Sequence, residues 1–153
     1  MKQILVISDI HGSADNLEAV LGREKYSDVI FCGDGIRDVM ESRISPSAGR
    51  FFVRGNADRH FFGNIKYELT VGIHGRLFFI THGDEYGVKD GIGSLLLYCR
   101  ENYIDIAVFG HTHSQMLREE SGIIFFNPGS LISGNYGLIK CSGRKYSFVH
   151  KKL

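Results

Sequence analysis

The fold is decided by the stretch Ile4-Leu5-Val6-Ile7-Ser8-Asp9-Ile10-His11, in which four apolar residues give way at once to a polar cluster. The same change from apolar to polar recurs four more times, at residues 29–34, 51–58, 77–84 and 106–113. Continuous runs of β-branched and aromatic residues of this length are typical of strands buried on both faces. We therefore predict five such strands, each followed by a polar loop.

Helical patterns separate several of these runs. Residues 14–23 and 91–102 each place apolar side chains at helical spacing on one face. A shorter helix is expected within 34–45. It should stop at Ser45-Pro46, because the residue before a proline avoids the helical region. Strands that alternate with helices predict an α/β fold with a central sheet.

The remaining segments are antiparallel in character. Residues 66–71 and 76–80 flank Gly72-Ile73-His74-Gly75, and this arrangement predicts a hairpin. Three further strands are expected in the C-terminal third, at residues 123–126, 136–141 and 146–150. No linker or internal repeat divides the sequence. We therefore expect one domain over residues 1–153, in which a mixed second sheet accompanies the first.

The charge balance limits the classes of partner. The 153 residues contain 18 Lys and Arg against 17 Asp and Glu, a formal net charge of +1. A protein that grips long nucleic acid needs a basic face, so this balance argues against such a partner. No apolar run reaches the length of a signal-peptide core or a membrane helix, and the three cysteines have no CxxC spacing. We therefore expect a cytoplasmic protein with no membrane partner.

Side chains of related chemistry follow the five apolar runs. They are Asp9, His11, Asp34, Asn56, His82, His111 and His113. Ligands of open α/β sheets bind at the carboxyl ends of the strands, so we expect these groups to converge on one rim. Asp9 and His11 lie two residues apart, as do His111 and His113, and each pair shares one face if the backbone stays extended.

Carboxylate, imidazole and carboxamide groups together suit first-row divalent cations such as Mn, Fe, Zn, Co or Ni. Seven such ligands exceed what one four-coordinate zinc takes, and they fit two metal ions that share a bridging carboxylate. Each motif alone has an ordinary structural explanation, as a capped turn, a loop that tolerates positive φ or a satisfied core histidine. The combination of all five strand ends is what indicates a metal centre.

Five motifs follow one another along the chain: Asp9-Ile10-His11, Gly33-Asp34, Gly55-Asn56-Ala57-Asp58, Thr81-His82-Gly83 and Gly110-His111-Thr112-His113. In this order they resemble the motifs of the calcineurin-like metallophosphoesterases. The chain length and the segment Asn127-Pro128-Gly129-Ser130 resemble the small single-domain branch of bacterial and archaeal phosphodiesterases. The resemblance implies a four-layer αββα sandwich of two mixed sheets with a dinuclear metal centre.

The resemblance also implies a ligand set. One metal ion is expected at Asp9, His11 and His113. The other is expected at Asn56, His82 and His111, and Asp34 is expected to bridge both. Manganese is the first expectation for the two ions, with iron, nickel, zinc or cobalt as alternatives.

The implied activity is hydrolysis of phosphodiester bonds in a small substrate by attack of a metal-bridging hydroxide. Catalytic roles then fall to Asp34, Asn56, Asp58 and His111. Asp58 either orients a ligand or a proton donor, or it caps a loop. Larger family members carry a histidine where this chain has Ala57, so the proton for the leaving group is expected from His60, from metal-bound water or from solvent.

Other functions compete with this one. A eukaryotic retromer subunit resembles the same small branch, so a non-catalytic protein-interaction scaffold is the first alternative. A phosphomonoesterase or protein phosphatase is another, and a nuclease is a third that the near-neutral charge disfavours. Phe61 and Phe62 are candidates for a pocket wall, and Arg54 and Arg59 are candidates for contact with substrate phosphate or for ordinary surface residues. The sequence leaves the substrate and the oligomeric state undetermined.

Overall fold

The computed structural model describes all 153 residues and contains two five-stranded sheets. The first sheet consists of β1 (Lys2–Ile7), β2 (Asp28–Phe31), β3 (Gly49–Phe52), β9 (Asn135–Ser142) and β10 (Lys145–Lys152), in the order β10-β9-β1-β2-β3. The second consists of β4 (Glu68–Ile73), β5 (Arg76–Thr81), β6 (Ile106–Val108), β7 (Gln115–Glu120) and β8 (Ile123–Pro128), in the order β4-β5-β6-β8-β7.

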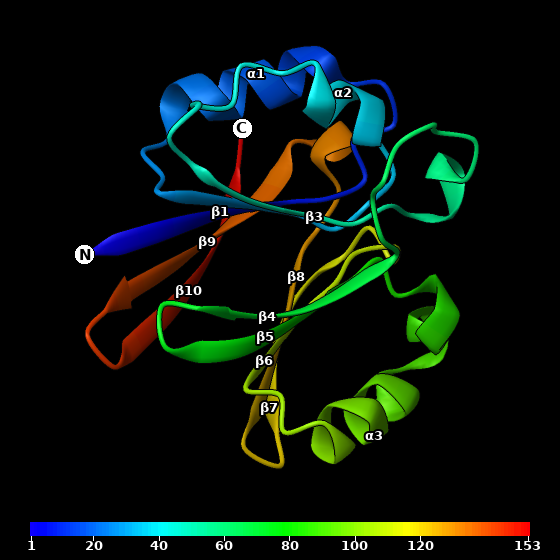
Figure 1. Ribbon diagram of the computed structural model, residues 1–153, viewed down its shortest axis with the longest axis vertical. Helices are drawn as coiled ribbons and strands as arrows, with labels where there is room; N and C mark the ends of the chain where they lie inside the picture. Colours follow the sequence, from blue (N-terminus) through cyan, green and yellow to red (C-terminus); the bar gives the residue numbers. More distant parts are fainter.

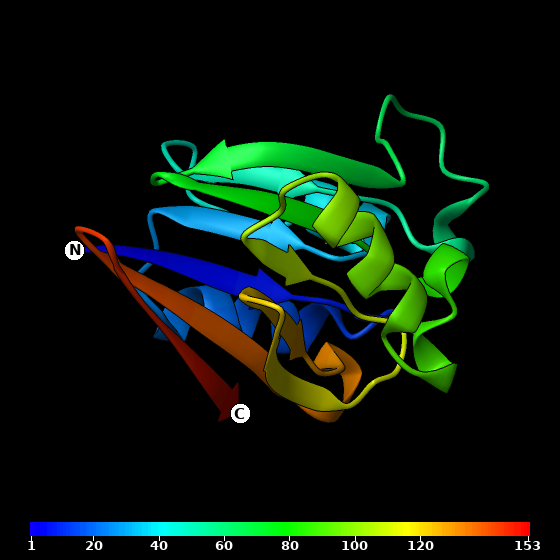
Figure 2. The ribbon, with the colours of Figure 1, turned by 90° about the horizontal axis from the view of Figure 1, so that it is seen from below.

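Each sheet contains three neighbouring parallel strands, and its other two strands join through antiparallel pairing. β1, β2 and β3 are parallel in the first sheet, and β5, β6 and β8 are parallel in the second. The carboxyl ends of both parallel groups lie at the same end of the molecule, on the right of Figures 1 and 2. Loops that follow strands of different sheets therefore meet there.

Alternating side chains on the strands explain the four layers. Leu5 and Ile7 of β1 pack toward α1 (Ala14–Arg23) and α2 (Ile36–Met40), whereas Ile4 and Val6 pack between the two sheets. A third cluster lies between the second sheet and α3 (Gly93–Glu101), on the opposite outer face (Figure 1). The αββα sandwich of two mixed sheets that the family resemblance implied is confirmed.

The hairpin of the second sheet is tighter than the sequence suggested. Gly72 and Ile73 belong to β4, and Ile73 pairs directly with Arg76 of β5. The turn consists of His74 and Gly75 alone, both with positive φ, as two-residue hairpin loops commonly require.

One further element differs from expectation. β7 was not predicted, because its sequence Gln115–Glu120 is mostly polar and it forms an exposed edge of the second sheet. The short helix expected within 34–45 is present as Ile36–Met40. None of the helices has the length and apolar character that crossing a membrane requires.

Candidate metal centre

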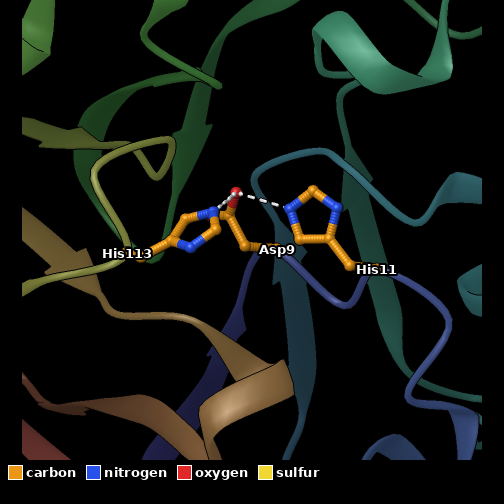
Figure 3. A group of neighbouring side chains, drawn as sticks. All are labelled: Asp9, His11 and His113. Carbon is orange, nitrogen blue, oxygen red and sulfur yellow. Dashed lines mark ion pairs between the residues drawn. The ribbon is translucent and has the colours of Figure 1, made fainter.

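The carboxylate of Asp9 lies at the centre of a group of imidazoles at the end of β1. Its Oδ1 atom is 3.1 Å from Nε2 of His113, 3.5 Å from Nε2 of His11 and 3.9 Å from Nε2 of His82. Figure 3 shows the rings of His11 and His113 on either side of this oxygen. Loops of both sheets contribute, since β1 belongs to the first and residues 82 and 113 follow strands of the second.

A second carboxylate extends the cluster. Oδ2 of Asp34, in the loop after β2, is 3.1 Å from Nε2 of His82 and 3.6 Å from Nε2 of His11. Nδ1 of His111 in turn lies 3.1 Å from Nε2 of His82. Two overlapping groups of possible ligands result, namely Asp9, His11 and His113, and Asp9, Asp34 and His82.

Asn56 is the one proposed ligand whose side chain forms neither a hydrogen bond nor an ion pair within this cluster. It is exposed at the start of the short 3-10 helix η1 (Asn56–Asp58). The next residue is in contact, however, because the backbone N–H of Ala57 donates to Oδ1 of Asp34 at 2.9 Å. The structure therefore places the backbone of Ala57 against the cluster, but not the side-chain carboxamide of Asn56.

The Asp9 carboxylate gives the clearest test of whether a cation fits. Its Oδ2 atom accepts hydrogen bonds from Ser8 Oγ at 2.6 Å and from the His111 N–H at 3.1 Å. Its Oδ1 atom is buried and accepts no hydrogen bond, an arrangement that costs about 1–3 kcal/mol when nothing compensates. Oxygen and imidazole nitrogen donors gathered around such an atom fit a divalent first-row metal ion.

The backbone of the ligand loops is not extended, and this corrects the geometry expected from sequence. Positive φ values occur at Asp9 (53°), His11 (45°), Asp34 (65°), His111 (69°) and His113 (63°). Asp and His adopt this left-handed conformation more readily than most residues. The loops turn sharply off the strand ends, and the side chains meet through this turning rather than through the alternation of a strand.

Two glycines permit the close approach of loops at the centre. A Cβ atom at Gly55 would lie 2.1 Å from Oδ1 of Asp34. One at Gly110 would lie 2.0 Å from Ser8 Oγ and 2.7 Å from Oδ2 of Asp9. Any side chain at either position would displace one of the two central carboxylates.

Asp58 organises the turn that carries Asp34. Its Oδ2 atom accepts the backbone N–H groups of Asp34 and Gly55 at 2.7 and 2.9 Å. Its Oδ1 atom accepts those of Gly35 and Ile36 at 2.9 and 3.2 Å. The side chain is buried and bonded to backbone throughout, so it contacts the loop rather than the imidazole cluster.

Asn127 is a buried residue of the centre for which the sequence suggested no role. Its Nδ2 group donates to Gly110 O at 3.1 Å and to Thr112 Oγ1 at 3.0 Å, on either side of His111. The signal was present, because the apolar run of β8 also ends in a polar cluster, at Asn127. Ser130, three residues later, donates to the carbonyl of Asp9 at 3.2 Å.

The charges of the cluster influence one another. Burial raises the pKa of the Asp34 carboxyl, but the hydrogen bond and charge of His82 outweigh it and hold this pKa below its ordinary value. Burial lowers the pKa of His82, but Asp34 and Asp9 outweigh it and raise this pKa. Burial and the neighbouring His82 lower the pKa of His111.

Sequence comparison relates this chain to known proteins. A model of the calcineurin-like phosphoesterase superfamily domain matches residues 1–151. The chain is 32% identical to the probable metallophosphoesterase YsnB of Bacillus subtilis, over 84% of this chain and 74% of that protein. It is 30% identical to the phosphodiesterase YfcE of Escherichia coli, over 86% of this chain and 80% of that one.

More distant proteins resemble this chain in fold alone. Vps29 from Entamoeba histolytica, in a single-mutant form, superposes with a TM-score of 0.80 at 20% identity, over 99% of this chain and 92% of that one. Because the family model matches residues 1–151, nearly the whole length of this chain, the chain belongs to the calcineurin-like phosphoesterase superfamily.

Proposed function

We propose that this protein is a phosphodiesterase that hydrolyses a small phosphate ester with two divalent metal ions, manganese first among the candidates. The observation that carries the proposal is Oδ1 of Asp9, which is buried without a hydrogen bond and has three imidazole nitrogens within 3.9 Å. Membership of the phosphoesterase superfamily supports ester hydrolysis as the reaction.

The proposed ligand set divides the clustered side chains between two ions. Asp9, His11 and His113 would hold one ion, and Asn56, His82 and His111 would hold the other, with Asp34 shared. The distances among the aspartates and histidines support this division. Asn56 would join by a rotation of its exposed side chain, because its neighbour Ala57 already contacts Asp34.

Divalent cations at such a site lower the pKa of a bound water and offset charge on the phosphoryl oxygens. The residues of the chain supply fixed positions. Asp34 is held through Oδ1 by the Ala57 N–H, so that Oδ2 faces His82, and Asp58 fixes the turn beneath it. Ligands held in this way need little rearrangement during the reaction. Catalytic roles are proposed for Asp34, Asn56 and His111, and Asp58 acts through Asp34.

A reconstitution assay tests the proposal. Chelated and Mn-loaded protein would be compared on three kinds of substrate. Release of 4-nitrophenol would be measured with bis(4-nitrophenyl) phosphate and with 4-nitrophenyl phosphate, and product formation would be measured with cyclic nucleotides. We expect metal-dependent turnover that favours the diester and falls at least about 100-fold in Asp34→Asn. Asp38→Asn is the matched control, because Asp38 is half-buried on α2 and forms no ion pair or side-chain hydrogen bond.

The same assay decides between the alternatives. Equal, negligible turnover in chelated, Mn-loaded and Asp34→Asn protein would reject the enzyme in favour of an interaction scaffold, which the fold likeness to Vps29 fits. Faster turnover of the monoester than of the diester would identify the enzyme as a phosphomonoesterase instead of a phosphodiesterase.

A further inference from the structure

A small cavity begins directly beside the proposed metal centre. Its volume is about 200 Å³, and its walls include Ile36, Arg37, Ala57, Asp58, His60 and Phe61. Ala57 connects the two sites, since its side chain lines the cavity while its N–H donates to Asp34 Oδ1 at 2.9 Å. A substrate whose phosphate lies at the centre would therefore extend its next group toward this cavity.

The cavity combines an apolar interior with a cationic rim. Ala57 and Phe61 supply its apolar surface, and Ile36, which is 1% exposed, belongs to the core against which Phe61 packs. Asp58 presents no free acceptor, because its two oxygens already accept four backbone N–H groups. Arg37 is exposed and forms no ion pair, so its guanidinium is available to a ligand.

The Phe61 wall is held in place by Arg54. Nη2 of Arg54 donates to the Phe61 carbonyl at 2.6 Å, and the guanidinium lies 5.6 Å from the Phe61 ring and 5.5 Å from the Tyr67 ring. The N–H of Arg54 also donates to the Lys66 carbonyl at 3.0 Å, which closes the base of the loop. In Figure 1 this loop stands beside α2 at the end where the strands converge. The cavity is thus formed before a ligand arrives.

Size and charge together limit what the cavity accepts. At about 200 Å³ it is smaller than the 300–1,000 Å³ typical of complete ligand sites, so it suits one portion of a small molecule. Its apolar wall suits a carbon framework, and the unpaired Arg37 at the rim suits phosphate or carboxylate oxygens.

We propose that this cavity is the subsite for the second ester group of the substrate, and that it selects an organic group with a negative charge of its own. The apolar part of that group packs against Ala57 and Phe61, and its charge contacts Arg37. The inference rests on the proposed phosphodiesterase function and specifies the class of its substrate, a small diester that carries an additional anionic group.

A matched pair of chromogenic esters tests the charge preference. Thymidine 5′-(4-nitrophenyl phosphate) would be compared with the same ester bearing a 3′-phosphate, on Mn-loaded protein. We expect the 3′-phosphate to lower KM about fivefold, the upper range for an exposed charge pair. The difference disappears in Arg37→Gln and persists in Arg43→Gln, a control at an exposed arginine outside the cavity. Equal KM values in the wild type, or a difference that Arg37→Gln retains, would overturn the proposal.

A binding measurement separates this inference from the proposed function. Thymidine 3′,5′-bisphosphate would be titrated into metal-free protein while the backbone amide signals of Arg37 and Phe61 are followed by NMR. We expect these signals to shift in wild type and Arg43→Gln, with about fivefold weaker binding in Arg37→Gln. Shifts without any ester turnover would reject the phosphodiesterase and retain the anion subsite, whereas turnover without shifts or KM preference would reject the subsite alone.

Discussion

Replacement of Asp58 by Asn keeps the size of the side chain and removes half of its acceptor capacity. The carboxylate accepts four backbone N–H groups, two at each oxygen, from residues on both sides of the Asp34 turn. The amide of Asn has one oxygen and one NH₂ group. Two backbone donors therefore lose their acceptor and face a donor instead.

The expected loss of stability follows from these contacts. Hydrogen bonds to a charged acceptor contribute about 1.5 kcal/mol each at the lower end, so loss of two costs about 3 kcal/mol. The site is buried, with Asp58 8% exposed, so water does not replace the lost acceptor. For a chain of this length the free-energy loss corresponds to a fall in Tm of about 6–12 °C.

Urea denaturation of metal-free protein, followed by circular dichroism, measures this loss. Chelator is required because metal binding adds stability of its own and would hide the effect of the variant. Asp15→Asn is the control, since Asp15 is exposed in the first turn of α1 and is expected to change stability by no more than about 0.5 kcal/mol. Calorimetric titration with Mn²⁺ then measures the effect on the centre, expected as at least about tenfold weaker binding.

Two outcomes would refute the reasoning. If Asp58→Asn unfolds within about 1 kcal/mol of wild type, the four hydrogen bonds do not hold the Asp34 turn as their geometry indicates. If stability falls as expected but Mn²⁺ binds with wild-type affinity, Asp58 supports the fold without positioning Asp34.

Three further predictions concern neighbouring contacts. Ser8→Ala removes the 2.6 Å hydrogen bond to Asp9 Oδ2 and should weaken Mn²⁺ binding about tenfold in calorimetry; unchanged affinity would contradict the orienting role. Ala57→His should change the ratio of diesterase to monoesterase turnover on aryl phosphates, and an unchanged ratio would remove any role for that position. Burial raises the pKa of Glu24, but the hydrogen bonds from Lys151 and Tyr136 and the nearby charges together outweigh it and hold the pKa below its ordinary value. A lowered carboxyl pKa stabilises the fold above the unfolded pKa and loses this effect as pH falls through the folded one. Glu24→Gln should therefore be less stable than wild type by about 1 kcal/mol at pH 7, with the gap closing in acid; a gap independent of pH would contradict the linkage.

The elements predicted from sequence are those in which local pattern and burial coincide. The runs at residues 4–7 and 29–32 became buried strands because their apolar side chains have cores on both faces of the sheet. β7 escaped prediction for the opposite reason, because an exposed edge strand needs no apolar alternation and is fixed by its pairing with β8. The extent of the β4–β5 turn likewise follows from strand pairing, in which Ile73 opposes Arg76.

Part of the candidate site also follows from the sequence, and part of it does not. The types of its ligands follow from sequence, because metal chemistry restricts them to carboxylate, imidazole and amide groups. The partners that orient them do not, since Asp58 and Asn127 act through backbone atoms of other loops. The small cavity depends on packing between α2 and the loop after β3, and no local pattern describes such a contact.

The sequence by itself indicated an α/β fold with a second, mixed sheet and the residue types of the candidate ligand cluster, because both depend on which residue types follow one another along the chain. The αββα layers were implied by the family resemblance. Only the tertiary structure decided how these ligands meet. Residues 9 and 111 are 102 positions apart, yet the N–H of one donates to the carboxylate of the other at 3.1 Å. Contact at that separation requires the carboxyl ends of both sheets to pack together. At that end of the molecule the loop backbone lies in the left-handed region, and one oxygen of Asp9, without a hydrogen bond, is directed at three imidazoles.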